Sequence, residues 1–218
     1  MTAPAPLSGL RIMLVDDHPI VRRGVRDILA DAFPQAHIQE VGCGAEAIAL
    51  VQTSAWDIVI LDLTLPDGSG LDVLKRIRES QSRLPVLVLS MHAADQFARR
   101  AIAAGASGYL TKDTADLELV TAATRLLRGG KYFGPQVLEH VVLSMHPDRS
   151  EHPHERLSDR EYQVLRMIGS GRTVSEIATT LGLSVKTVST YRARVLDKME
   201  MRTNAELTHY VVQQKLTE

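Results

Sequence analysis

Five side chains suited to phosphoryl chemistry stand where short apolar runs of the chain end. Three of them are carboxylates, which repel each other in one crevice unless a cation lies between them. Oxygen ligands in a small cleft favour a hard divalent ion such as Mg²⁺. A lysine and a hydroxyl beside that ion would bind an incoming anion, as phosphoryl transfer to a carboxylate requires. The five residues are Asp16, Asp17, Asp62, Ser90 and Lys112.

The apolar runs that precede these residues alternate with amphipathic stretches. The expected strands are Arg11–Val15, His37–Val41 (the faintest), Ile58–Leu61, Pro85–Leu89 and Gly108–Leu110. The expected helices are Ile20–Ala30, Ala45–Gln52, Gly70–Glu79, Asp95–Ala104 and Asp116–Arg128. This alternation predicts an α/β fold, a (βα)5 doubly wound parallel sheet with helices on both faces. Functional residues collect at the carboxyl edge of such sheets, so the five side chains are expected to converge. Because no G-x-G-x-x-G follows the first strand, a dinucleotide-binding domain is disfavoured.

The pattern becomes polar and then purely helical in the last third of the chain. A short helix is expected within Val137–Met145, and His146–Glu155 is polar, contains two prolines and is typical of a linker. The linker histidines His146, His152 and His154 are expected to be solvated. Four helices are predicted after it, at Asp159–Ile168, Val174–Leu181, Ser184–Met199 and Ala205–Lys215. The predicted organisation is a tail (1–9), an α/β domain (10–131), a linker with a short helix (132–155) and an all-α four-helix domain (156–218).

The second and third of these helices have the spacing of a helix-turn-helix. Ala178 permits close packing, Gly182 supplies the turn and Val188 anchors the second helix. Ser184 is a good N-cap for that helix. Its predicted apolar side consists of Val185, Val188, Val195, Leu196 and Met199. Residues 156–218 carry ten basic and seven acidic side chains, whereas the whole chain has a net charge of −1, which hints at a polyanionic partner.

Composition excludes several other classes of protein. With 44% hydrophobic and 23% charged residues, the chain is expected to be globular and soluble. A single cysteine, Cys43, rules out an intramolecular disulfide and favours a reducing compartment. No secretory signal is expected, and the apolar runs are too short to span a bilayer. The expected location is therefore cytoplasmic, without a membrane partner.

Residues 10–131 resemble the receiver domain of response regulators. The resemblance rests on VDDH (15–18), DLTLPDGSG (62–70), LS (89–90) and GYLTKD (108–113). It implies that Asp62 is the phosphoacceptor and that Ser90 and Lys112 bind the phosphoryl group, with Tyr109 as the switch aromatic. It also implies that Asp17, Asp62 and the carbonyl of Thr64 ligate Mg²⁺, with Asp16 acting through water. Asp113 stands where many receivers have proline, so their usual cis peptide is expected to be absent.

The segment from Leu157 to Met199 resembles the LuxR-type DNA-binding domain of the NarL/FixJ family, most specifically in LSDREYQVL and KTVSTY. The resemblance implies that Ser189, Thr190 and Ala193 face base edges, although Ala193 replaces the polar residue often seen there. Lys186, Arg192 and Arg194 would contact phosphates or bases, and Thr187 belongs to the same DNA-facing set. The last helix resembles the dimerisation helix of the family, although its Leu207, Val211 and Val212 are equally consistent with core packing.

Together the two resemblances imply a phosphorylation-controlled transcription regulator that is not a turnover enzyme. The implied partners are a sensor histidine kinase, double-stranded promoter DNA and a second copy of the chain on phosphorylation, with RNA polymerase as a further candidate. One alternative is a phosphatase that uses Asp62, which would need a second acid at position 64, where Thr64 stands. Another is a quorum-sensing regulator, whose first domain would need an apolar, aromatic-rich pocket for a small signal. Nine aromatic residues in 218 and the acidic cluster at the strand ends argue against it.

Overall fold

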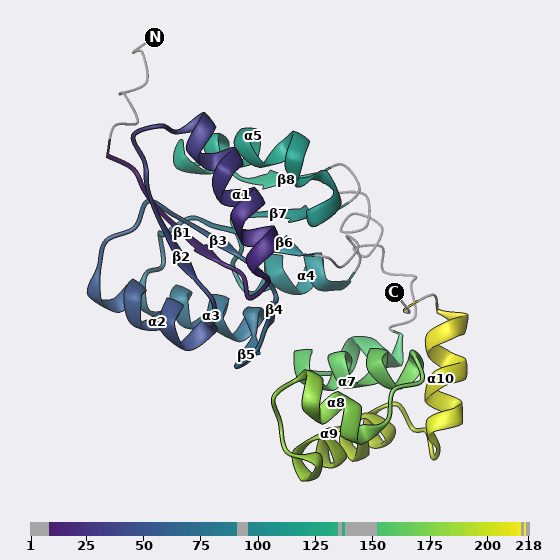
Figure 1. Ribbon diagram of the computed structural model, residues 1–218. Coiled ribbons are helices and arrows are strands. Elements are labelled where there is room, and N and C mark those ends of the chain that lie inside the picture. The colour runs from purple at the N-terminus through teal and green to yellow at the C-terminus, as the bar shows by residue number, and fades with distance from the viewer. Residues whose placement is uncertain (1–8, 91–95, 135–136, 138–151, 215, 217–218) are drawn as a thin grey trace. The chain divides into compact units, whose positions relative to one another are not determined.

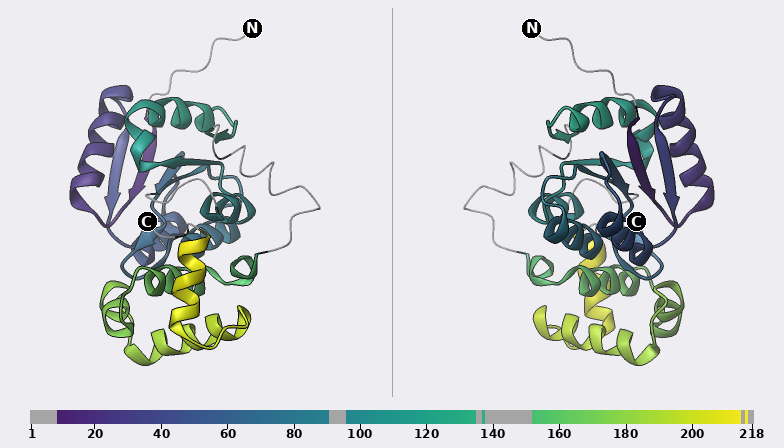
Figure 2. Two further views of the ribbon diagram at one scale, coloured as in Figure 1. Left: turned by 90° about the vertical axis from the view of Figure 1, so that its right-hand side faces the viewer. Right: turned by 90° about the vertical axis from the view of Figure 1, so that its left-hand side faces the viewer.

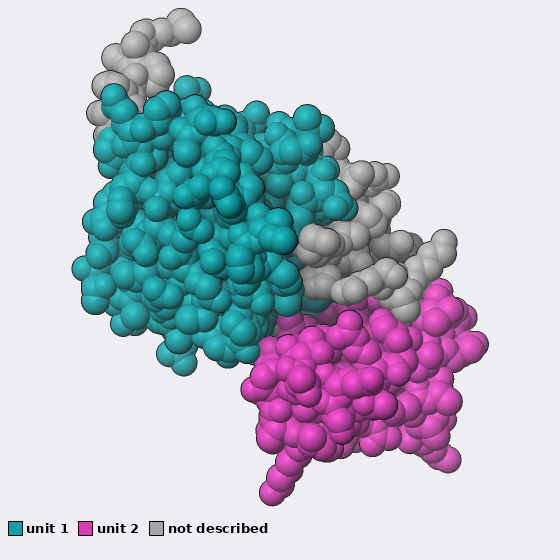
Figure 3. Space-filling model, in the orientation of Figure 1, with its two compact units in different colours: residues 1–146 teal, residues 147–218 magenta. Residues whose placement is uncertain are grey.

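The computed structural model describes residues 9–90, 96–134, 137, 152–214 and 216. The chain divides into two compact units, residues 1–146 and 147–218 (Figure 3). Among the described residues, no helix is long and apolar enough to cross a membrane. The predicted short helix at Val137–Met145 lies outside the described residues except for Val137, and so does His146.

The first unit is a six-stranded parallel sheet in the order β2-β1-β3-β6-β7-β8, which confirms the predicted α/β class. Its strands are β1 (Arg11–Val15), β2 (His37–Val41), β3 (Ile58–Leu61), β6 (Val86–Ser90), β7 (Gly108–Thr111) and β8 (Tyr132–Phe133). Its helices are α1 (Pro19–Ala32), α2 (Gly44–Thr53), α3 (Gly70–Ser80), α4 (Gln96–Ala103) and α5 (Ala115–Leu127). A two-stranded hairpin, β4 (Thr64–Leu65) and β5 (Gly68–Ser69), follows β3, and a 3-10 turn (Lys112–Thr114) follows β7.

Helices cover both faces of this sheet, α1 and α5 on one and α2, α3 and α4 on the other (Figures 1 and 2). Because both faces are buried, the central strands β1, β3 and β6 are mostly apolar, and every residue of β3 and β6 is buried. On the α1 and α5 side, Ile12 and Ile60 pack in one core cluster with Leu29 and Leu119. The order of the strands brings the carboxyl ends of β1, β3, β6 and β7 to one edge of the sheet.

Strand β8 was not predicted, since Tyr132–Phe133 falls in the segment expected to be linker. It pairs in parallel with Gly108 and Tyr109 of β7. Two residues are too few for a strand pattern to be visible in a sequence. The pairing depends on Gly108, because a Cβ there would lie 2.7 Å from the carbonyl oxygen of Tyr132.

The second unit is helical, as predicted. A 3-10 turn (Pro153–Arg156) precedes α7 (Asp159–Gly169), α8 (Val174–Thr180), α9 (Val185–Lys198) and α10 (Asn204–Gln213). Ser158 and Thr173 begin α7 and α8 with capping boxes, and the hydroxyls of Ser184 and Thr203 accept backbone hydrogen bonds at the starts of α9 and α10. Gly169 lets α10 approach α7 closely, because a Cβ there would lie 2.3 Å from a methyl group of Val211.

The turn between α8 and α9 has the geometry of a helix-turn-helix. Gly182 has a φ of +61°, in the left-handed region that favours glycine, and the amide of Leu183 donates to the carbonyl of Ala178 at 2.9 Å. Ala178 and Val188 are buried, as predicted. Val185 is not part of the apolar side of α9 as predicted, because the first residue of the helix is 52% exposed.

The prediction of solvated linker histidines is wrong for His154, which is only 3% exposed. Its Nδ1 lies 2.5 Å from the hydroxyl of Tyr210, and its ring stacks on His152 and Tyr162. The aromatic residues of α7 and α10 thus bury a residue whose polar neighbours in the sequence suggested exposure. Ordered structure before α7 therefore begins by Pro153, inside the predicted linker.

Candidate phosphorylation site and DNA-binding helix

Asp62 lies directly after β3, with only 2% of its surface exposed. The amide of Thr64 donates to Asp62 Oδ1 at 3.2 Å, which turns the chain into the β4–β5 hairpin. Gly70, the first residue of α3, packs on the backbone of Asp62, because a Cβ there would lie 2.2 Å from the Asp62 carbonyl oxygen. The hairpin and α3 therefore hold the Asp62 backbone in place.

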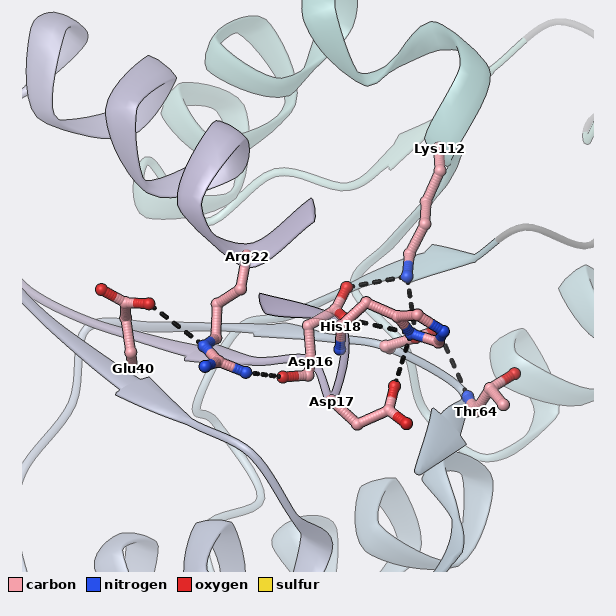
Figure 4. A network of polar contacts seen from close by, with 8 residues as sticks. Asp16, Asp17, His18, Arg22, Glu40, Thr64 and Lys112 are labelled. Carbon is pink, nitrogen blue, oxygen red and sulfur yellow. Dashed lines mark hydrogen bonds and ion pairs between the residues drawn. The ribbon is translucent and has the colours of Figure 1, made fainter. Parts of the chain in front are cut away.

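Lys112 bridges two of the predicted carboxylates. Its Nζ lies 2.7 Å from Asp16 Oδ2 (Figure 4). The same atom lies 2.8 Å from Asp62 Oδ2, and the lysine side chain is 6% exposed. Burial by itself lowers the pKa of Lys112, but its contacts with Asp62 and Asp16 outweigh burial, so that the net pKa is raised. Both carboxylates thus favour the charged form of Lys112 at the ends of β1, β3 and β7.

Asp17 and His18 complete the acidic edge. The Nδ1 atom of His18 lies 2.6 Å from Asp17 Oδ1, and the His18 amide donates to Asp16 Oδ1 at 2.7 Å. Asp16, Asp17, His18 and Asp62 each offer one ligand atom, and these four atoms lie within 4.8 Å of one another. Three carboxylates face one lysine here, so the donors and the charge fit a divalent cation. His18 was not among the predicted site residues, although its place directly after the acidic pair could have indicated it.

The pKa of Asp62 is raised from its ordinary value, first by burial and further by the charge of Asp16, while Lys112 and the amide of Thr64 act in the opposite direction. A nucleophilic carboxylate has to be ionised. A cation at the acidic cluster would favour the ionised form, and this links metal binding to the reactivity of Asp62.

The remaining predicted residues of this site lie on β6 and β7. Ser90 ends β6, is fully buried and pairs in register with Thr111, so it stands at the same edge as Lys112. Tyr109 is fully buried as well. Leu110 belongs to the cluster under α1 and α5, so the alternation of a strand points Tyr109 to the opposite face. The peptide bond after Lys112 is trans, as expected.

Arg22 of α1 holds the backbone of Asp16 in place, a role that was not predicted from the sequence. Its Nη1 donates to the carbonyl of Asp16 at 2.6 Å and its Nε to Glu40 Oε2 of β2 at 3.1 Å (Figure 4). A single arginine on an amphipathic helix gives no sequence signal for this role. Its contacts fix the backbone that presents Asp16.

Helix α9 presents most of the predicted DNA-facing residues to solvent. Lys186, Ser189, Thr190, Ala193 and Arg194 are exposed, and Thr187 and Arg192 are partly buried. Two of these side chains have local roles. The hydroxyl of Thr187 lies 2.8 Å from that of the N-cap Ser184, and Arg192 Nε donates to Asn204 Oδ1 at the start of α10. The exposed residues form a polar and basic face of the helix.

The fold and these two sites define a class of protein, a phosphoacceptor receiver domain joined to a helix-turn-helix DNA-binding domain. Residues 12–124 match the family described as "Response regulator receiver domain", and residues 155–211 match "Bacterial regulatory proteins, luxR family". The chain belongs to the NarL/FixJ family of two-component response regulators.

Relatives of known name align over nearly the whole chain. Response regulator UvrY of Escherichia coli K12 is 35% identical over 208 residues, which cover 95% of both chains. Response regulator GacA of Pseudomonas aeruginosa is 33% identical over 199 residues, covering 91% of this chain and 93% of GacA.

Two solved structures are similar in fold. A LuxR-family two-component response regulator from Aurantimonas sp. SI85-9A1 is 38% identical with a TM-score of 0.58, covering 63% of this chain and 98% of that one. The response regulator RcsB, solved as a DNA complex, is 25% identical with a TM-score of 0.57, covering 94% of this chain and 98% of that one.

Proposed function

We propose that Asp62 accepts a phosphoryl group from a sensor histidine kinase and that the modified chain binds promoter DNA through α9. The observation that carries the proposal is the position of Lys112 Nζ, within 2.8 Å of both Asp16 and Asp62 in a buried crevice. A buried, charged lysine beside a buried carboxylate provides a nucleophile and a group that neutralises the anion it receives.

In the proposed reaction an Asp62 oxygen attacks the phosphorus atom of the donor phosphohistidine, the phosphorus–nitrogen bond breaks and the imidazole leaves. Lys112 and the hydroxyl of Ser90 bind the transferred phosphoryl oxygens. The carboxylates of Asp16, Asp17 and Asp62 and the carbonyl of Thr64 would hold Mg²⁺, which supplies charge neutralisation to the transferring group. The hydrolysis of the acyl phosphate returns Asp62, so we propose no other turnover chemistry for the site.

Two exposed apolar side chains support a protein as the donor. Ile20 and Leu117 are 89% and 81% exposed, and they lie in the first turns of α1 and α5. Both helices begin at the edge that carries Asp16 and Lys112. Any protein that brings a phosphohistidine to Asp62 has to cover this edge, and it would bury both side chains.

For DNA, we propose that α9 lies in the major groove. Lys186 and Arg194 are exposed cations that suit phosphates, and Ser189 and Thr190 carry short hydroxyls that suit base edges. The response regulator RcsB, which is similar to this chain over 94% of its length, was solved as a DNA complex, and this supports the proposal. A homodimer on paired half-sites is the expected bound form, and RNA polymerase is a further proposed partner.

The test is to incubate the full chain with Mg²⁺ and acetyl phosphate and to measure its intact mass. One base-labile phosphoryl group is expected on the chain and none on Asp62→Asn, because an amide is not a competent nucleophile. Asp31→Asn, which changes an exposed carboxylate in the last turn of α1, is the matched control and should be phosphorylated normally. Full phosphorylation of Asp62→Asn would refute the assignment.

A further inference from the structure

Strand β7 joins the proposed phosphorylation site to the start of the linker. Lys112 directly follows its last residue, and its first two residues, Gly108 and Tyr109, pair with Tyr132 and Phe133 of β8. The strand has only four residues. The rise of an extended backbone is nearly fixed, so a movement at the Lys112 end is passed to the end that carries β8.

Tyr132 of β8 packs against the core cluster under α1 and α5, and few polar contacts hold the strand besides. The amide of Tyr132 donates to the carbonyl of Ser107 at 3.1 Å, and its hydroxyl donates to Glu118 Oε2 of α5 at 2.7 Å. Figure 1 shows β8 beside β7 at the end of the sheet. On its other side β7 pairs with β6 through four residue pairs, twice as many as it forms with β8. When β7 is displaced, the pairing with β8 is therefore the one that yields.

We propose that β8 is a clamp that phosphorylation opens: Tyr132–Phe133 is paired to β7 in the unmodified chain and leaves it when Asp62 carries a phosphoryl group. This inference rests on the proposed function of Asp62. In the unmodified chain Lys112 contacts the carboxylates of Asp16 and Asp62 directly. A phosphoryl group inserts new anionic oxygens between Asp62 and the ammonium, so Lys112 has to move to contact them.

Opening the clamp would release residues 131–134 from the sheet, ahead of the DNA-binding unit. An extended residue spans about 3.3 Å, so release of residues 131–134 would add on the order of 10 Å of reach. The signal would then reach the second unit as a change in linker length.

Hydrogen exchange of the full chain tests the clamp, with and without acetyl phosphate and Mg²⁺, and with occupancy measured by intact mass. The Tyr132 amide should exchange several-fold faster in the phosphorylated chain. The amide of His37, the first residue of the opposite edge strand β2, donates to the carbonyl of Leu10, and its exchange rate should be unchanged. A chain that is fully phosphorylated without faster exchange at Tyr132 would overturn the inference. A chain that gains no mass would overturn the proposed function and the clamp with it.

A reversible phosphoryl analogue tests the reciprocal effect. Tyr132→Phe removes the hydrogen bond to Glu118 but keeps the ring, so it favours the open clamp. By linkage it should tighten the binding of beryllofluoride with Mg²⁺ roughly two- to fivefold, the equivalent of one weak hydrogen bond. Thr121→Ala, on an exposed position of α5, is the control and should leave this Kd unchanged. An equal Kd in Tyr132→Phe and the unaltered chain would count against the clamp.

Discussion

Lys198 Nζ lies 2.7 Å from Glu161 Oε2, although Glu161 is only 3% exposed. This ion pair joins α9 to the first turn of α7. Glu161 also accepts a hydrogen bond from the amide of Ser158 as part of the capping box. One buried carboxylate therefore both starts α7 and fixes the helix that is proposed to enter DNA.

This pair predicts a loss of stability in acid. Burial by itself raises the pKa of Glu161, but the hydrogen bonds from Lys198 and Ser158 outweigh it and hold the pKa below its ordinary value of 4.5. The stabilisation is thus present above pH 4.5 and is lost as the pH falls toward the pKa of the folded state. Lys198→Met should cost about 1–2 kcal/mol of unfolding free energy at neutral pH in the fragment 147–218, because the lysine is partly exposed.

Urea unfolding at pH 7 and at several values below pH 5 measures both effects. The difference between Lys198→Met and the unaltered fragment should shrink in acid. Arg194→Met, a change of another basic residue exposed on α9, is the control for loss of charge alone. A difference that is independent of pH would show that the ion pair does not contribute.

The acidic cluster predicts a metal affinity that depends on Asp17. Asp17→Ala should weaken Mg²⁺ binding by at least about tenfold, since a hard cation loses one of three carboxylates. The same change should raise the melting temperature without metal, because three carboxylates share one lysine in the crevice. Calorimetric titration with Mg²⁺ measures the affinity and a thermal melt without metal measures the stability, with Asp31→Ala as the control for both. An unchanged affinity would mean that Asp17 is not a ligand.

The exposed side chains of Ile20 and Leu117 predict a defect in phosphotransfer that is specific to a protein donor. Ile20→Ser and Leu117→Ser should slow phosphotransfer from an autophosphorylated sensor kinase several-fold, because the protein donor has to cover both residues. Acetyl phosphate does not cover the surface, so its reaction should keep its rate. Val212→Ser, at a residue 59% exposed on the second unit, is the matched control. Equal slowing with both donors would point to damage at the site itself.

The face of α9 predicts two kinds of DNA-binding defect. Lys186→Ala or Arg194→Ala should weaken binding to all duplexes alike and lower the salt slope by about one unit for each phosphate that is no longer neutralised. Ser189→Ala or Thr190→Ala should instead reduce discrimination between operator and variant sites by roughly 1–3 kcal/mol for each base edge involved. Gel shifts at three salt concentrations separate the two. A fragment 147–218 without salt-dependent binding would refute the DNA-binding role.

Much of the fold is visible in the sequence because its signals are local and repeated. Strands β1, β3 and β6 each contain an apolar run of four residues, and the acids that follow β1 and β3 lie where the sheet brings strand ends together. The spacing of Ala178, Gly182 and Val188 likewise predicts a single local turn. Such patterns need no knowledge of distant contacts.

The features that could not be predicted from the sequence depend on contacts between distant residues. Strand β8 has two residues and depends on the absence of a side chain at Gly108, 24 positions earlier in the numbering. His154 is buried by Tyr210, which lies on the last helix. Arg22 acts through a backbone carbonyl. For His154 and Arg22, the residue type alone suggests a solvated surface group.

The shortness of β8 also bears on solubility. A long, flat edge strand is a template on which other chains can add strands and aggregate. This edge of the sheet offers two residues, too few to hold the backbone of another chain, and the hydroxyl of Tyr132 is already bonded to α5. In the unmodified chain β8 therefore covers the four-residue strand β7 without itself offering a template for amyloid-like association.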